Sequence, residues 1–132
     1  HVNVQDEALV KVDSLSDLFK DNHCIVLTVT SDTKTKNLID QSIFSSLSSP
    51  VSLINTSRPE VINEKDLINA LLDNKLNCYF SDFPLNTFSV KNAIEINKLN
   101  SKVFYTNHIA GSANKSVNLA DEIVIKMALE ES

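Results

Sequence analysis

The chain has 132 residues, of which 42% are hydrophobic and 22% are charged, and this composition fits one folded domain. Its net charge of −5 argues against nucleic acid as a partner, because phosphate backbones attract basic surfaces. No apolar run approaches the roughly 18 residues of a membrane-spanning helix, so a membrane protein is not expected.

Glycine and arginine are unusually scarce in this chain. Average glycine usage would give roughly nine residues here, yet the chain contains one, Gly111, and its one arginine is Arg58. A single glycine cannot build a G-x-G-x-x-G dinucleotide loop or a Walker A loop. Both loops are therefore excluded from this chain.

The two cysteines, Cys24 and Cys78, lie inside apolar runs and lack the spacing of metal ligands. Such residues are commonly buried thiols of proteins in a reducing compartment. We therefore expect buried thiols, no metal site and a cytoplasmic protein.

The chain begins with apolar runs separated by amphipathic stretches. Residues 8–12 are a weak candidate for a strand. A short helix is expected to begin after Asp13 or Ser14 and to end at Lys20, because its apolar residues share one helical face. Residues 24–29 form a continuous β-branched run with the length of a buried strand.

The middle of the chain repeats the same alternation. A helix is expected over residues 40–47 and a strand over 51–55. The strongest helix pattern covers 63–73, with an asparagine as N-cap and Asn74 suited to a left-handed stop. Residues 78–81 form the next strand.

A long polar connection is expected after this strand, followed by a strand over residues 102–106 and a long helix that begins after Ser112. The whole pattern predicts an α/β fold with a parallel sheet of about four to five strands and helices on both faces. In such sheets, ligands bind at loops that follow the carboxyl ends of the strands.

These loops and their neighbours carry five motifs with a family resemblance. The motifs are similar to L-H-x-P-L-T-x-x-T-x-x-L-I, N-T-x-R-G, V-V-D-E-x-x-L-x-x-A-L, L-D-V-F and P-H-I-A-G-S. In that order they occupy residues 26–39, 51–58, 61–71, 81–83 and 107–112. Together they resemble the NAD-binding domain of the D-isomer-specific 2-hydroxyacid dehydrogenases, with the 3-phosphoglycerate dehydrogenase branch as one candidate.

The resemblance implies a Rossmann-like fold and an NAD-dependent oxidoreductase that transfers a hydride between a 2-hydroxy acid and nicotinamide. It assigns Arg58 to the substrate carboxylate, which a planar guanidinium can bind through two hydrogen bonds. It assigns His108 as the acid/base, since imidazole titrates near neutral pH. The implied NAD contacts are Thr56, Ser57, Arg58, Asp82, His108, Ile109, Ala110 and Gly111.

The chain also departs from the family pattern. The family pairs its histidine with a glutamate, but the corresponding position here is Asn86 or Thr87, neither of which is charged. Thr28 and Thr30 replace the histidine and proline of the first motif, and Pro59 replaces the glycine after the arginine. Pro59 removes a backbone donor and restricts the residue before it to extended conformations.

Residues 1–132 are therefore expected to be a partial NAD-binding domain, without the Gly-rich half or the substrate domain, and inactive alone. The alternatives are a catalytically impaired relative that senses or binds NAD, and a structural fragment without activity. The partners expected in the complete enzyme are NAD and a small 2-hydroxy or 2-oxo acid. We also expect a homodimer, because the run at residues 24–29 would be an apolar edge strand.

Overall fold

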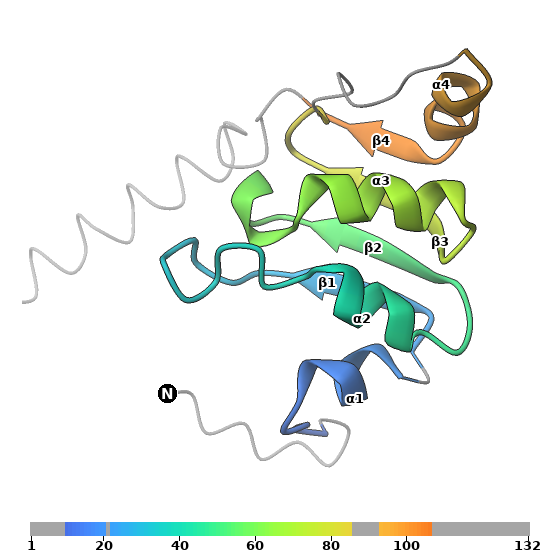
Figure 1. Ribbon diagram of the computed structural model, residues 1–132. Helices are drawn as coiled ribbons and strands as arrows, with labels where there is room; N and C mark the ends of the chain where they lie inside the picture. The colour runs from blue at the N-terminus through green and yellow to red at the C-terminus, as the bar shows by residue number, and fades with distance from the viewer. Residues whose placement is uncertain (1–9, 21, 86–92, 107–132) are drawn as a thin grey trace, which may run out of the picture.

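The sheet is parallel and has four strands in the part of the chain that the structure describes. This computed structural model describes residues 10–20, 22–85 and 93–106 (Figure 1). The strand order is β1-β2-β3-β4, and all three neighbouring pairs are parallel. The strands are β1 (Cys24–Leu27), β2 (Val51–Asn55), β3 (Leu76–Ser81) and β4 (Val103–Tyr105). The predicted α/β, Rossmann-like parallel sheet is confirmed.

Within the described residues, one helix precedes β1, and three further helices and one short 3-10 turn connect the strands. They are α1 (Leu15–Phe19), α2 (Gln41–Ser46), the 3-10 turn η1 (Pro59–Val61), α3 (Glu64–Leu72) and α4 (Ala93–Asn100). Side chains of Ser14, Asp40 and Asn63 accept hydrogen bonds from backbone N–H groups in the first turns of α1, α2 and α3. Asn74 has a φ of 58°, so the chain leaves α3 in the left-handed conformation that the sequence predicts.

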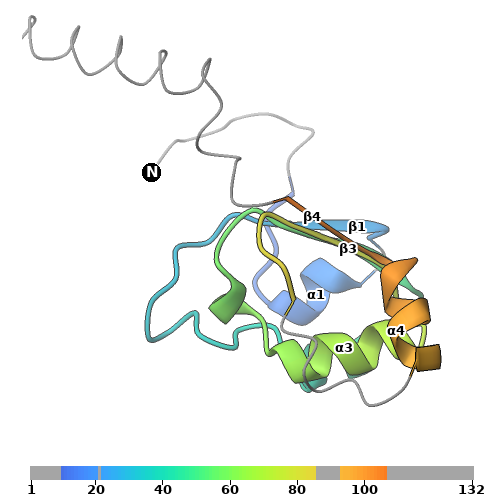
Figure 2. The same cartoon turned by 90° about the horizontal axis from the view of Figure 1, so that it is seen from above.

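The four described helices pack against the same face of the sheet. Figure 2 shows α1, α3 and α4 on one side of the strands, and the buried Ile43 and Phe44 of α2 belong to the same core. Strand residues alternate between the two faces, so Val51 and Leu53 of β2 reach into this core. The core therefore lies between one helix layer and one face of the sheet.

The opposite face of the sheet carries an apolar row. Val26, Ile54, Phe80 and Phe104 are register partners on the four successive strands. Val26 is 52% exposed, Phe80 40% and Phe104 47%, and the two phenylalanine rings stack with centroids 5.0 Å apart. The sequence predicts helices on both faces, whereas every described helix lies on the other face. The helix expected after Ser112 lies outside the described residues.

Three sequence expectations need correction within the described residues. Residues 10–12 of the weak candidate strand are not in a strand, and residues 8 and 9 lie outside the described part. The long polar connection contains α4, whose polar composition conceals its helical pattern: Leu99 is buried but Ile94 is exposed. Cys24 is exposed, because its side chain shares the uncovered face with Val26.

The one-sided core leads to a stability prediction. Leu53 is 0% exposed at the centre of the sheet, so Leu53→Ala should lower the free energy of unfolding by about 2–5 kcal/mol through lost burial and the cavity left behind. Ile94 is 71% exposed, so Ile94→Ala should change it by less than about 0.5 kcal/mol. Urea unfolding measures both, and equal effects of the two substitutions would contradict this packing.

Candidate functional site

A buried asparagine shapes the turn at the carboxyl end of β2. Asn55 is 1% exposed, and its Oδ1 accepts a hydrogen bond from the backbone N–H of Ser57 at 2.9 Å. Its Nδ2 donates to the carbonyl oxygen of Arg58 at 3.1 Å and to the hydroxyl of Tyr79 at 3.3 Å. This amide therefore fixes the backbone from residue 55 to residue 58.

The same turn is tied to the loop that follows β1. The N–H and hydroxyl of Thr56 both donate to the carbonyl oxygen of Leu27, at 3.1 and 2.8 Å, and the Ser57 hydroxyl donates to the carbonyl oxygen of Val29. The two loops border an open cavity of about 420 Å³. Its lining is Thr28, Val29, Thr30, Ser31, Thr56, Ser57 and Arg58. Because the Thr56 and Ser57 hydroxyls donate to backbone carbonyls, the groups here that could bind a small anion are the other hydroxyls and the Arg58 guanidinium.

Arg58 is exposed at the rim of this hydroxyl-lined cavity. Its backbone is extended, with φ −127° and ψ 151°, as the following Pro59 requires. The guanidinium carbon lies 5.6 Å from the ring centroid of Phe83, within cation–π range. Its Nη1 donates to the carbonyl oxygen of Ser57 at 3.4 Å. No carboxylate of the described residues forms an ion pair with this arginine.

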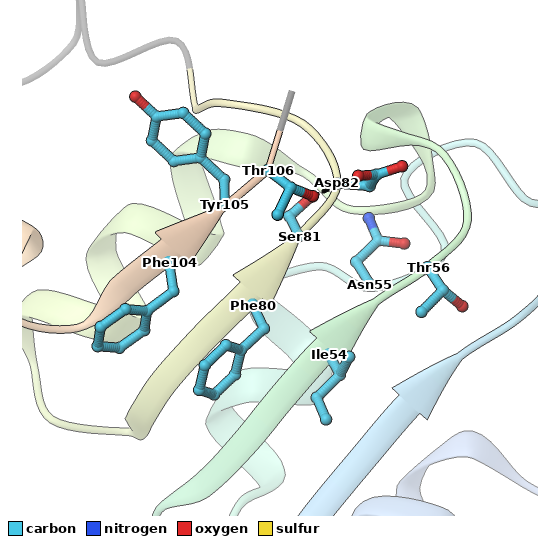
Figure 3. Close-up of a pocket in the computed structure, with 9 residues that line it drawn as sticks. All are labelled: Ile54, Asn55, Thr56, Phe80, Ser81, Asp82, Phe104, Tyr105 and Thr106. Atoms are coloured by element: carbon cyan, nitrogen blue, oxygen red, sulfur yellow. Dashed lines mark hydrogen bonds between the residues drawn. The ribbon is translucent and has the colours of Figure 1, made fainter. Parts of the chain in front are cut away.

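A second cavity, of about 270 Å³, lies at the carboxyl ends of β2, β3 and β4 (Figure 3). It is lined by Ile54, Asn55, Thr56, Phe80, Ser81, Asp82, Phe104, Tyr105 and Thr106. The Thr106 hydroxyl donates to a carboxylate oxygen of Asp82, which is buried. The surface that faces this cavity is mostly aromatic and aliphatic, and the polar lining residues contribute little of it.

The structure brings part of the predicted site together at one edge of the sheet. Thr56 lines both cavities, Ser57 and Arg58 line the hydroxyl-lined one, and Asp82 lines the second one. The other implied contacts, His108, Ile109, Ala110 and Gly111, lie outside the described residues. Asn86 and Thr87, the candidates for the glutamate position, also lie outside them.

Two residues of this edge lie within the family motifs but were given no role from the sequence. Asn55 follows Val51 and Leu53 at the spacing of one strand face, so a polar residue at a buried position was the available signal. Phe83 gave no such signal, because its contact with Arg58 joins residues from two different loops. Among the described residues, no group of three or more His, Cys, Asp and Glu could hold a metal ion. None of the described helices is long and apolar enough to cross a membrane.

Comparison with protein-family models gave a match over most of the chain. Residues 1–110 match the model of the D-isomer specific 2-hydroxyacid dehydrogenase, NAD binding domain. The chain belongs to this family. A comparison with curated proteins gave no match.

Solved structures of family members resemble this one. D-mandelate dehydrogenase of Rhodotorula graminis is 30% identical, with a TM-score of 0.65 over 80% of this chain and 30% of the relative. D-lactate dehydrogenase of Aquifex aeolicus, solved with NAD and lactic acid, is 26% identical, with a TM-score of 0.67 over 88% of this chain and 39% of the relative. D-lactate dehydrogenase of Lactobacillus jensenii, at 22% identity and a TM-score of 0.68 over 86% of this chain and 38% of the relative, shares the fold. The chain thus spans less than two fifths of the length of each of these three relatives.

NAD is the cofactor of this family's domain. In the second cavity, Phe80 and Phe104 form an aromatic wall, and Thr56 and Asp82 also belong to the lining. The single glycine of the chain cannot form the Gly-rich loop that holds a pyrophosphate.

Burial of the Tyr79 phenol makes the stability of the fold depend on pH. Burial, the largest cause, raises the pKa of Tyr79 above its ordinary value of 10.0, against the opposing effects of hydrogen bonds from Ser81 and Asn55. The phenol ionises more readily in the unfolded chain than in the folded one. Its contribution to stability is therefore complete below about pH 10 and is lost as the pH rises through the folded-state pKa.

We predict that the free energy of unfolding declines above about pH 10 and that Tyr79→Phe makes this decline shallower. Urea unfolding at a series of pH values measures the slope. The difference in phenolate absorbance between the native protein and the variant reports the titration of Tyr79 directly. Ionisation of Tyr79 at or below its ordinary pKa would contradict the prediction.

Proposed function

We propose that residues 1–132 supply the C-terminal part of the NAD-binding domain of an oxidoreductase that transfers a hydride between a 2-hydroxy acid and nicotinamide. The family match and the shared edge of Arg58, Thr56 and Asp82 support this proposal. The main observation behind the proposal is Arg58, whose exposed guanidinium lies beside a cavity that is otherwise lined mainly by hydroxyl-bearing residues.

In this proposal Arg58 binds the carboxylate of the substrate. Its planar fork can donate two parallel hydrogen bonds, which fix the orientation of the carboxylate and of the carbon next to it. A lysine at this position would provide the charge without the fork. The hydroxyls of Thr56 and Ser57 both donate to carbonyl oxygens of the β1 loop, so they hold the arginine turn in place.

Asp82 and Thr56 would hold the nicotinamide end of the cofactor. The Asp82 carboxylate can accept a hydrogen bond from a carboxamide N–H, while the Thr106 hydroxyl fixes its orientation. When bound, NAD accepts or donates the hydride, and the protein aligns the ring with the substrate carbon.

His108 would exchange the proton of the substrate hydroxyl. Its family partner is a glutamate, and the uncharged Asn86 or Thr87 here cannot raise the basicity of the imidazole as a carboxylate does. Losing such a partner typically costs about 10–100-fold in activity. This substitution, together with Pro59, favours a second candidate function: a catalytically impaired relative that binds or senses NAD.

The proposal also includes expectations about the substrate class, the cellular location and the oligomeric state. A 3-phosphoglycerate dehydrogenase-like substrate rests on the motif resemblance alone. A cytoplasmic location is favoured by the free thiols of Cys24 and Cys78. A homodimer is favoured by β1, which lies at the edge of the described sheet and leaves one side of its backbone without a neighbouring strand.

Small ligands test the carboxylate site in the 132-residue chain. Titration with D-lactate should shift the backbone amide signals of Thr56, Ser57 and Arg58 in NMR spectra. Arg58→Gln should weaken this binding by about tenfold or more, since hydrogen bonds between charged groups are worth about 1.5–3 kcal/mol. Lys34→Gln is the matched control, because it removes an exposed positive charge from the loop after β1.

Equal losses in the two variants would mean that general charge attraction, and not the Arg58 fork, binds the anion. Calorimetry with NADH should show no micromolar affinity, because a chain with one glycine cannot form the Gly-rich pyrophosphate loop. Micromolar NADH binding by the 132-residue chain would overturn this expectation.

The dimer is tested through the edge strand. We predict that light scattering detects a dimer or a larger species, and that Val26→Lys shifts the chain toward the monomer, because a lysine on an edge strand opposes pairing with another chain. Ile94→Lys adds the same charge on the exposed side of α4 and should leave the oligomeric state unchanged. A monomer at high concentration, with slow amide exchange along β1, would contradict the prediction.

A further inference from the structure

We propose that Asn55 and Phe83 are positioning residues that hold Arg58 ready for a carboxylate: Asn55 fixes its backbone and Phe83 fixes its guanidinium. The inference rests on the proposed function, in which Arg58 binds the substrate. It adds roles for two residues that lie within family motifs but to which the resemblance assigns no role, one at the end of β2 and one in the loop after β3.

Asn55 anchors the arginine turn to the core. Its side chain lies on the helix-facing side of β2, where burial leaves it little freedom to move. One amide group makes three hydrogen bonds, to the N–H of Ser57, the carbonyl of Arg58 and the hydroxyl of Tyr79. A side-chain amide supplies the two N–H donors and the carbonyl acceptor that these three bonds use. The backbone of Arg58 is thereby fixed before any ligand arrives.

Phe83 contacts the guanidinium through a cation–π interaction. The guanidinium carbon of Arg58 lies over the Phe83 ring, 5.6 Å from its centroid. The ring carries no carboxylate that could bind the guanidinium N–H donors, so this contact does not take them from a substrate carboxylate. A neighbouring acid would instead compete with the substrate for the same donors.

The loop that carries Phe83 is itself held in place. The N–H of Phe83 donates to the Ser81 hydroxyl at 3.1 Å, directly after β3. Pro59 and Phe83 line the same small cavity, so the ring lies next to the residue that restricts the Arg58 backbone. Arg58 is therefore constrained from the turn after β2 and from the loop after β3.

The Arg58 side chain can be observed directly by NMR. In the native chain, ring currents from Phe83 should move the Arg58 Hδ and Hε signals upfield, and the Arg58 Nε should relax as an ordered group. Phe83→Leu should return these shifts to random-coil values and reduce the order, whereas Phe83→Tyr should preserve both. A residue that is merely structural would not produce this signature in Arg58.

The Asn55 contribution is separated by a matched pair of variants. Asn55→Asp keeps the acceptor for Ser57 N–H but loses the donor to Arg58, so the amide signals of Thr56 and Arg58 should broaden while the fold persists. Asn55→Ala should lose the turn more completely. Asn77→Ala is the control. Asn77 lies at the start of β3, at the opposite end of the strand from the site, and its Nδ2 donates to the carbonyl oxygen of Pro50. It should leave Arg58 unchanged.

D-lactate titrations separate this inference from the proposed function. If the carboxylate binds, Phe83→Leu should weaken it by about two- to fivefold, the range expected from an exposed cation–π contact. If D-lactate does not bind but the Arg58 signals respond as described, the proposed function fails and the positioning roles stand. Unchanged Arg58 shifts and relaxation in both Phe83→Leu and Asn55→Asp would overturn the positioning proposal.

Discussion

Val51, Leu53 and Asn55 share the helix-facing side of β2, and burial of that side connects the core to the site. The first two side chains pack among the helices, and the third uses its amide to form the turn beyond the strand. A buried amide without partners would be costly, so the turn and the core stabilise each other. The position of Arg58 thus follows from the packing of the central strands.

The two faces of the sheet have different roles in this arrangement. One face binds all the described helices, and the other presents the row Val26, Ile54, Phe80 and Phe104. Three members of that row, Ile54, Phe80 and Phe104, form a wall of the second cavity. An exposed apolar surface of this kind can bind a flat ring at its edge, and its centre can pack against other protein segments. The aromatic pair is therefore both part of a sheet face and part of a candidate cofactor site.

Local patterns were sufficient where a residue's own neighbours decide its conformation. Asn63 and Asp40 begin helices because their side chains bind backbone N–H groups within the next turn, and Asn74 ends one through its left-handed backbone. A continuous β-branched run predicted β1, and the stretch that follows Pro50 predicted β2. The pattern failed for α4, where only one of the described side chains is fully buried and polar residues dominate.

The sequence by itself determined the order of the four strands and of helices α1 to α3, the absence of a Gly-rich loop and, through its motifs, Arg58 and Asp82 as candidate site residues. Only the tertiary structure decided which face of the sheet the helices cover, why Cys24 is exposed, and that Asn55, Tyr79 and Phe83 surround the arginine turn. The reason is physical. Caps, turns and strand runs depend on residues a few positions apart, whereas cavities and side-chain contacts depend on how separate strands align in the sheet.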